Sequence, residues 1–298
     1  MDTIISGFEN LLTWFVNTVD GPLWDITILL LLGVGMFFTI TTGLVQLRLL
    51  PRSIREMWGG RAAEGDSLTP FQAFATGLAS RVGVGNIGGV ATAIALGGPG
   101  AVFWMWVTAF IGMSSAFAES TLAQLYKTRD PNGMFRGGPA YYITRGLKFK
   151  PMAIAFAVTL IFTFGFAFNA VQSNSIVAAT TNAWGWKGEY VGAVLVILTG
   201  IIIAGGVKRI GQVSSRVVPM MALFYLIIAV IILGMNMSRV PAMFGLIIDS
   251  AFDFSAVAGG MFGSLVSKTM LMGIKRGLFS NEAGMGSAPN SAATSDAK

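Results

Sequence analysis

The sequence contains no cysteine and no histidine among its 298 residues. The absence of cysteine excludes disulfides, thiolate metal sites and cysteine nucleophiles. The absence of histidine excludes the commonest general base and proton relay. Charged residues are also scarce, at 11% of the chain, whereas soluble domains usually contain about 25%. This scarcity argues against a soluble enzyme.

Hydrophobic residues, by contrast, make up 54% of the chain, and the mean hydropathy is +0.69. The 38 glycines are typical of membrane helices, where small residues let neighbouring helices approach closely. The composition therefore predicts an all-α membrane protein in contact with a lipid bilayer. The formal net charge of +6 is spread over loops, so we expect no nucleic-acid partner.

Seven apolar segments are long enough to cross a bilayer core about 30 Å thick. They are 25–47, 70–96, 101–126, 151–183, 190–206, 216–236 and 256–284. The preceding segment, 1–24, is amphipathic and carries Trp14 and Trp24, so we expect it to lie on the membrane surface. Residues 1–298 are expected to form a single transmembrane domain.

Basic residues alternate between the loops. Thirteen lie in the loops after the first, third and fifth segments: Arg48, Arg52, Arg55, Arg61, Lys127, Arg129, Arg136, Arg145, Lys148, Lys150, Lys208, Arg209 and Arg216. The intervening loops contain only Lys187 and Arg239, and residues 1–25 contain no base. The positive-inside rule then places the rich loops in the cytoplasm and the N-terminus outside.

Glycines at 83, 85 and 88 in "RVGVGNIG" have the spacing of a dinucleotide-binding loop. No strand precedes them, however, and they lie inside an expected membrane span, so the nucleotide interpretation fails. We instead expect the helix to break here, because non-helical backbone within a membrane is tolerated where it lines a cavity. A close helix-packing face is the alternative interpretation of the glycines.

A second glycine-rich interruption, "GIKRGLFSNEAGMGS", spans residues 273–287. Broken helices at corresponding positions of two halves are typical of secondary transporters with inverted repeats. We therefore expect a first five-helix repeat at 70–236. The broken first helix of a second, incomplete repeat would then occupy 256–287.

Several long motifs resemble the alanine or glycine:cation symporter family, over nearly the whole chain. They are "GVGNIGGVATAIALGGPGA", "GGPGAVFWMWVTAFIG", "AESTLAQLYK", "FRGGPAYYI" and "KRGLFSNEAGMGSAP". The resemblance implies a LeuT-type fold with one extra N-terminal helix at 25–47. It also implies sodium-coupled symport of alanine or glycine, and four further helices after residue 298. From this we expect the 298 residues to be a fragment that needs a partner chain to transport.

Substrate contacts are expected at both breaks and in the fourth span. Backbone groups of Val84 and Gly85 would meet the carboxylate of an amino acid, with the Asn86 amide nearby. The resemblance implies that Asn169 and Gln172 also contact the substrate, although interhelical hydrogen bonding is an equally good interpretation of either amide. Phe279 and the backbone around Gly284 would close the pocket.

Sodium, the expected coupling ion, would bind near Gly83 and Asn86 through uncharged oxygens. No other cofactor is expected. Arg81 and Glu119 are charges inside expected spans, where each costs roughly 2.5–3.5 kcal/mol at the bilayer centre. We expect them to pair or to lie near a cytoplasmic gate; the alternative is that both reach the inner interface.

The function predicted from these observations is symport of a small neutral amino acid into the cell across the plasma membrane by alternating access. Two alternatives remain at this point, an ion channel and a proton-coupled amino-acid transporter. An enzyme is not expected, because Glu119 and Glu282 are the only carboxylates expected within the spans after the first and form no obvious acid–base pair.

Overall fold

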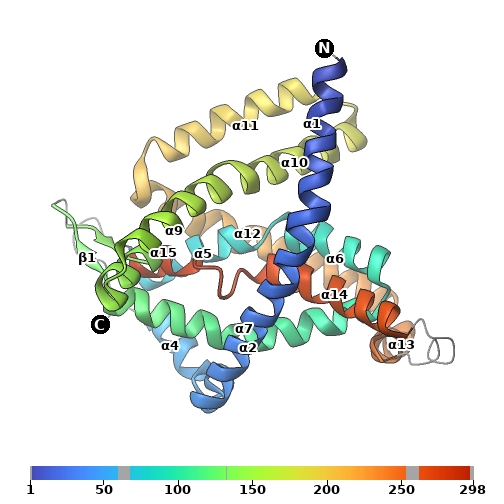
Figure 1. Ribbon diagram of the computed structural model, residues 1–298, viewed down its shortest axis with the longest axis horizontal. Helices are drawn as coiled ribbons and strands as arrows, with labels where there is room; N and C mark the ends of the chain where they lie inside the picture. Colours follow the sequence, from blue (N-terminus) through green and yellow to red (C-terminus); the bar gives the residue numbers. More distant parts are fainter. Residues whose placement is uncertain (1, 60–67, 132, 253–261, 296–298) are drawn as a thin grey trace.

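The computed structural model describes residues 2–59, 68–131, 133–252 and 262–295. Nearly all of this part of the chain is helical (Figure 1). The elements before the first break are α1 (Asp2–Phe15), η1 (Val16–Asp20), α2 (Gly21–Thr41), α3 (Val45–Arg48), α4 (Leu50–Gly59) and α5 (Pro70–Arg81). They are followed by α6 (Val84–Gly97), α7 (Gly100–Leu125), β1 (Thr128–Arg129) and β2 (Phe135–Arg136).

The second half of the chain continues the helical pattern. Its elements are α8 (Pro139–Tyr142), η2 (Ile143–Leu147), α9 (Lys150–Phe162), η3 (Thr163–Ala167), α10 (Phe168–Trp184), α11 (Gly188–Ile203), α12 (Gly206–Met235), η4 (Met237–Arg239), α13 (Val240–Ala251), α14 (Phe262–Asn281) and α15 (Ala288–Ala293). The strands β1 and β2 form a short antiparallel hairpin between α7 and α8.

Helix lengths agree with a membrane protein but differ from the expected boundaries. Four helices in the described residues are long and apolar enough to cross a membrane: Glu9–Thr41, Gly100–Leu125, Lys150–Trp184 and Gly206–Met235. Of the other three expected spans, 70–96 is broken, 190–206 corresponds to the shorter apolar helix Gly188–Ile203, and 256–284 lies partly outside the described residues.

The expected division between a surface helix 1–24 and a span 25–47 differs from the structure. Helices α1, η1 and α2 run on without interruption, because a π-helical stretch at Val16–Asp20 continues one helix into the next. The long helix ends at Thr41, and Gly43 and Leu44 reverse the chain with positive φ values. Helix α13 was also not predicted, because residues 240–251 lie between two expected spans.

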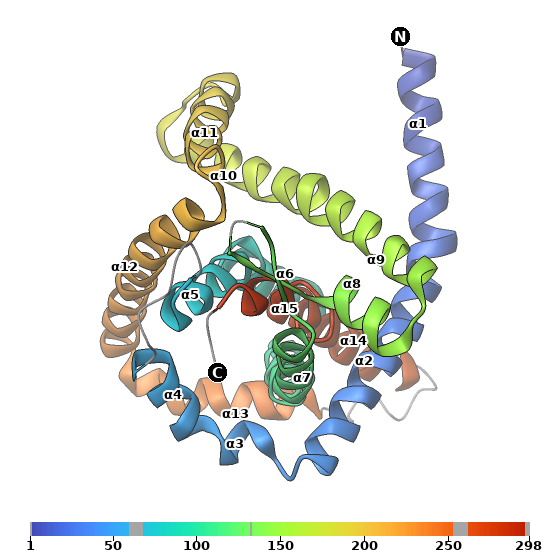
Figure 2. The ribbon, with the colours of Figure 1, turned by 90° about the vertical axis from the view of Figure 1, so that its left-hand side faces the viewer.

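The two interrupted helices and α7 occupy the middle of the molecule (Figures 1 and 2). Helix α14 packs along α6 and α7, and α15 packs against α5 and α7. Two buried clusters hold this centre together: Ile28, Ile274 and Leu278 where α2 meets α14, and Ala93, Ala101 and Met105 between α6 and α7. Small residues such as the two alanines allow the close approach that membrane helices favour.

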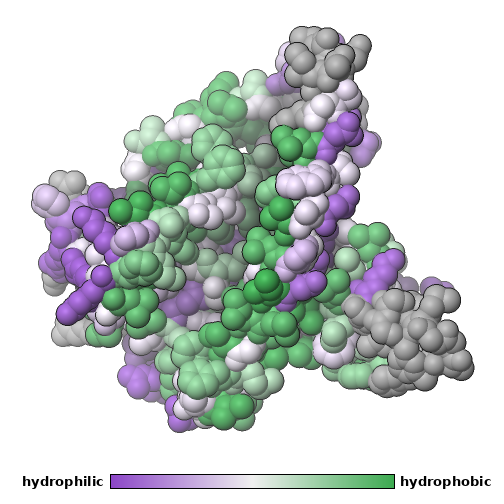
Figure 3. Space-filling model, in the orientation of Figure 1, coloured by the Kyte–Doolittle hydropathy of each residue, from purple (hydrophilic) through white to green (hydrophobic). Residues whose placement is uncertain are grey.

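The surface is largely apolar. Large hydrophobic side chains are exposed along α2, α9, α10, α11 and α12. Figure 3 shows this apolar surface across the helices, with hydrophilic residues gathered at the end of the molecule that carries the β hairpin. A soluble monomer rarely exposes large contiguous apolar patches, whereas the lipid of a bilayer can cover a surface of this kind.

Candidate functional site

The first predicted helix break is confirmed. Helix α5 ends at Arg81, Val82 has an extended conformation, and α6 begins at Val84. The freed N–H of Gly83 donates to the side-chain oxygen Oδ1 of Asn86 at 3.1 Å. Asn86 therefore caps the second half-helix, which stabilises the break because an unpaired N–H at membrane depth costs several kcal/mol.

The second predicted break is confirmed as well. Helix α14 ends at Asn281, and α15 starts at Ala288. Between them Glu282, Gly284 and Gly286 have positive φ values, which end the helix and turn the chain. The second interruption thus depends on glycine at positions 284 and 286.

The two interrupted helices lie side by side in antiparallel orientation. Hydrogen bonds join them along their length. Near one end, the Thr269 hydroxyl donates to the carbonyl of Gly97 at 2.7 Å. Beside the breaks, the Asn86 amide donates to the Ser280 hydroxyl at 2.8 Å. At the other end, the backbone N–H of Leu68 donates to the carbonyl of Thr294 at 3.3 Å.

Four of the predicted substrate residues come together at the breaks: Val84, Gly85, Gln172 and Phe279. The N–H of Val84 donates to the side-chain oxygen Oε1 of Gln172 at 3.3 Å. A Cβ atom added to Gly85 would lie 3.3 Å from the Phe279 ring, so glycine allows the ring to approach the backbone. The fourth expected span therefore meets both broken helices at one place.

An aromatic stack that was not predicted from the sequence lies against these four residues. Phe168 stacks on Phe279 with ring centroids 5.0 Å apart, and Phe164 stacks on Phe168 at 4.6 Å. Residues four apart lie on one face of a helix, so Phe164, Phe168 and Gln172 form one stripe. That spacing is visible in the sequence and could have identified Phe168.

Asn169 is not brought into this group. Its side chain is exposed and donates to the carbonyl of Gly165, on its own helix, at 3.1 Å. The face of α10 toward the breaks carries Phe168 and Gln172 instead. The structure therefore does not bring Asn169 together with Gln172, and a role of Asn169 in substrate binding stays a prediction.

Gly284 also lies elsewhere. Its N–H donates to Glu119 Oε1, and the N–H of Gly286 donates to Glu119 Oε2 at 2.9 Å. These two freed N–H groups of the second break are therefore bound by a carboxylate of α7. A Cβ at Gly284 would meet Leu31 of α2.

The expected pairing of Arg81 with Glu119 is not formed. Among the described residues, the ion pairs join Arg52 to Glu56 and Arg136 to Asp130. Glu119 is bound by backbone N–H groups, which stabilise a carboxylate through short, charge-assisted hydrogen bonds. Arg81 lies close enough to act on Glu119 electrostatically, but without direct contact.

The oxygens expected to bind sodium near Gly83 and Asn86 have partners within the protein. Asn86 Oδ1 accepts the N–H of Gly83, and the carbonyl of Gly83 accepts the N–H groups of Asn86 and Ile87 at 3.1 and 3.4 Å. Within the described ranges, no three Asp or Glu side chains cluster in a way that could hold a metal. A sodium site here stays a prediction.

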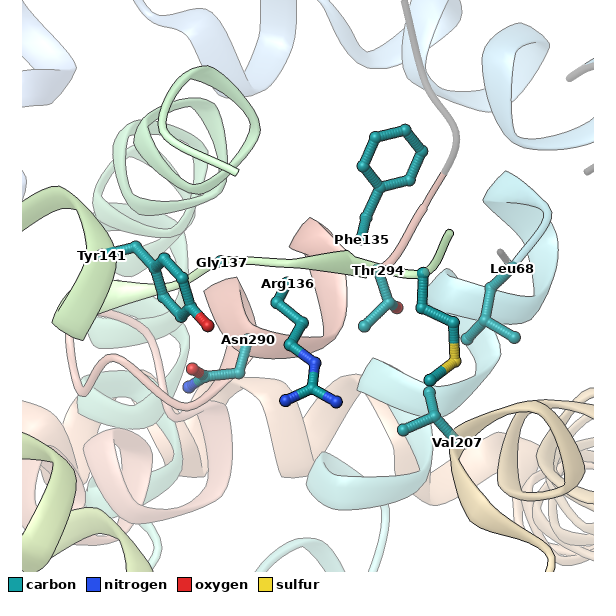
Figure 4. Close-up of a pocket in the computed structure, with 9 residues that line it drawn as sticks. Leu68, Phe135, Arg136, Gly137, Tyr141, Val207, Asn290 and Thr294 are labelled. Carbon is teal, nitrogen blue, oxygen red and sulfur yellow. The ribbon is translucent and has the colours of Figure 1, made fainter. Parts of the chain in front are cut away.

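A separate pocket of about 290 Å³ lies beneath the β hairpin, against α15 (Figure 4). Arg136 reaches into it between Asn290 and Val207. Its guanidinium binds Asp130 at 3.0 Å, so its charge is already compensated. The pocket contains none of the predicted site residues.

Interrupted helices that pair within a largely apolar helical bundle are typical of membrane transport proteins. The chain belongs to the Sodium:alanine symporter family, which it matches over residues 9–298.

Several proteins are similar to this chain over almost its whole length. A transporter of uncharacterised function from Haemophilus influenzae is 74% identical over 97% of this chain and 60% of its own length. The amino-acid carrier protein AlsT of Bacillus subtilis is 46% identical over 96% of this chain and 60% of its own length. The sodium/alanine symporter AgcS of Methanococcus maripaludis is 45% identical over 93% of this chain and 62% of its own length. The chain thus spans about 60% of the length of these relatives.

Proposed function

We propose that the chain binds and carries a small neutral amino acid, alanine or glycine, in symport with sodium. The single observation that supports this best is the meeting of Val84, Gly85, Gln172 and Phe279 at the paired helix breaks. The family membership and the names of AgcS and AlsT favour the same class of solute.

The site offers the two kinds of group that an amino acid needs. A carboxylate would bind at the start of α6, where the N–H groups and the positive end of the helix dipole favour an anion. In this arrangement the Gln172 amide oxygen occupies the N–H of Val84. Substrate would therefore displace Gln172 from that N–H, and the released amide would bind the incoming amino acid.

Phe168 and Phe279 would set the size of the pocket. A Cβ atom at residue 85 would already lie 3.3 Å from the Phe279 ring, so a bound amino acid beside Gly85 would have to carry a small side chain, such as a hydrogen or a methyl group. Larger side chains would have to separate the stack, which costs roughly 0.5–1.5 kcal/mol beyond the lost burial. Alanine and glycine fit this limit.

The antiparallel pairing of two interrupted helices supports a LeuT-type inverted repeat in which 70–236 is the first repeat and 256–287 begins the second. The basic loops support a cytoplasmic position for the hairpin and an outside N-terminus in the plasma membrane. Sodium would enter as co-transported substrate, coordinated by uncharged oxygens near Gly83.

Calorimetry on the purified chain in lipid nanodiscs tests this function. Binding of alanine or glycine should release heat in sodium chloride. No heat of binding is expected in choline chloride at the same ionic strength. Leucine and glutamate should bind at least tenfold more weakly. Equal alanine affinity in the two salts would contradict sodium coupling. If acidification instead restored binding in choline, the proton-coupled alternative would replace it.

A further inference from the structure

Helices α9 and α10 run on as one helix of 35 residues, Lys150–Trp184, through the π-helical turn η3 (the π turn). The backbone N–H of Phe168 reaches back five residues, to the carbonyl of Thr163, where an α-helix would reach back four. The turn has the sequence TFGFA, which combines a β-branched residue, two aromatic residues and a glycine. These are weak α-helix formers, so departure from the α conformation costs little here. Isolated π turns inside α-helices occur frequently at functional sites.

Contacts on both sides of the π turn hold this helix against the paired breaks. Before the turn, Phe156 of α9 packs on the second break, since a Cβ atom added to Gly286 would lie 2.6 Å from its ring. After the turn, Phe168 stacks on Phe279, and Gln172 accepts an N–H at the first break. The helix must therefore present the same face to the breaks before and after the turn.

The π turn decides whether these side chains share a face. Each residue of an α-helix adds about 100° of rotation, so in an unbroken α-helix Phe168 would lie about 120° round from Phe156, and Gln172 about 160°. A π turn takes up one extra residue, so Phe168 lies only about 20° from Phe156, and Gln172 about 60°. Without the turn, Ala167 and Val171 would occupy the directions that Phe168 and Gln172 now take.

Asn169 binds the π turn directly. Its side-chain amide donates to the carbonyl of Gly165, inside the turn, at 3.1 Å. Backbone donors and acceptors do not match one for one where a π turn joins an α-helix, so an added side-chain donor stabilises the turn. The side chain of Asn169 is exposed and does not lie with Gln172 at the breaks.

We propose that the π turn sets the rotation at which Phe168 and Gln172 face the breaks, and that Asn169 is a positioning residue that stabilises this turn. The proposal rests on the proposed function, because it concerns the orientation of the residues that would bind the amino acid. It gives the two amides of the Asn-x-x-Gln spacing different roles. Gln172 would contact the substrate, whereas Asn169 would act through the backbone.

The rotation can be measured by cross-linking, because the chain contains no cysteine of its own. A short bis-methanethiosulfonate linker in detergent should join the pair Phe168→Cys and Phe279→Cys several-fold more than the pair Ala167→Cys and Phe279→Cys. Adding Asn169→Ala should lower this ratio about threefold. Asn169→Ser should keep it, because a hydroxyl can still donate to the carbonyl four residues back.

Asn236→Ala is the matched control for the loss of such a bond. The Asn236 amide also donates to a carbonyl four residues back, that of Ile232, at 2.9 Å and at the end of α12. No π turn lies there, so this change should alter neither the cross-linking ratio nor alanine binding.

Alanine binding tests the link between the π turn and the site. Deletion of Gly165 removes the extra residue, so the helix can close as a regular α-helix with the same faces, and binding should stay within about twofold. Asn169→Ala alone should weaken alanine binding about fivefold. Combined with the deletion it should have no further effect, because there is then no turn to stabilise.

A folded Asn169→Ala variant with an unchanged cross-linking ratio would overturn the proposal. So would loss of alanine binding on deletion of Gly165 with helical content kept by circular dichroism. A double variant that binds as weakly as Asn169→Ala alone would overturn it too, since Asn169 would then contact the substrate itself. The cross-linking does not depend on alanine. The expected ratios in a chain that binds no alanine would therefore support the role of the π turn and contradict the proposed function.

Discussion

The side-chain amide of Asn86 donates a 2.8 Å hydrogen bond to the hydroxyl of Ser280 and thereby joins the two interrupted helices beside their breaks. The same amide accepts the N–H of Gly83 through Oδ1. One side chain therefore caps the second half of one broken helix and binds it to the other. Because both breaks are next to the candidate site, this contact fixes the position of Gly85 relative to Phe279.

Replacing Asn86 by alanine should destabilise the chain more than replacing Ser280. Asn86→Ala removes two hydrogen bonds and leaves a freed N–H, which costs about 1–3 kcal/mol, whereas Ser280→Ala removes one bond worth about 0.5–1.5 kcal/mol. Thermal unfolding in detergent measures both. The double variant should be no less stable than Asn86→Ala, because the Ser280 contact is already lost.

Asn236→Ala is the matched control, since the amide of Asn236 is exposed and binds only the carbonyl of Ile232 on its own helix, at 2.9 Å. It should change the unfolding temperature little. Strictly additive losses for Asn86 and Ser280 would contradict a direct contact between them.

Gln172→Ala should weaken amino-acid binding more than it weakens stability. Its hydrogen bond to Val84 is long, at 3.3 Å, and only partly buried, so water can replace the Gln172 amide at that N–H in the free chain. In the complex the amide would contact substrate, and its removal should lower affinity about tenfold. Calorimetry and thermal unfolding on the same samples separate the two effects. Gln212→Ala, on the exposed face of α12, is the control. Comparable losses in affinity and stability for Gln172→Ala would favour a purely interhelical role of Gln172.

Glu119→Gln should loosen the second break. The carboxylate accepts two backbone N–H groups, through one oxygen each, whereas an amide has a single acceptor oxygen. One N–H of Gly284 or Gly286 would then lose its partner, at a cost of about 1–3 kcal/mol. Hydrogen exchange at 283–287 should accelerate, while Glu189→Gln, at an exposed position in the first turn of α11, should have no effect.

The same geometry predicts that charge reversal will not rescue function. If Arg81 and Glu119 were an ion pair, Arg81→Glu combined with Glu119→Arg would recover what each single change loses. Glu119 binds backbone N–H groups, and an arginine cannot accept hydrogen bonds. The double variant should therefore bind alanine no better than either single variant, and recovery of binding would contradict this.

Both helix breaks could be predicted from the sequence because their cause is local. Glycines weaken a helix wherever they gather, whatever surrounds them. The apolar segments were found for the same reason, since length and composition alone determine whether a helix can cross a bilayer. The π-helical join at Val16–Asp20 left no such signal, so the continuous helix from Asp2 to Thr41 was not predicted.

The partners of the freed backbone could not be predicted because they are distant in sequence. Glu119 lies far along the chain from Gly284. The sequence of neither segment shows that α7 places the Glu119 carboxylate beside the N–H of Gly284. The choice between Phe168 and Asn169 depends on the rotation of α10 about its axis. In the structure Phe168 faces Phe279 of α14, and the amide spacing in the sequence does not show this.

Gly85→Val tests whether the backbone of the first break must approach the bound amino acid. A Cβ at residue 85 would lie 3.3 Å from the Phe279 ring, closer than ordinary contact, and 3.4 Å from the Ser280 backbone. A branched side chain adds two methyl groups there. Valine also fills the space above the N–H groups at the start of α6. We expect alanine binding to be lost while the helical content by circular dichroism is kept.

Gly192→Val, in α11 with open space at its Cβ position, is the control and should bind alanine normally. A Gly85→Val variant that folds and binds alanine with unchanged affinity would place the amino-acid site elsewhere.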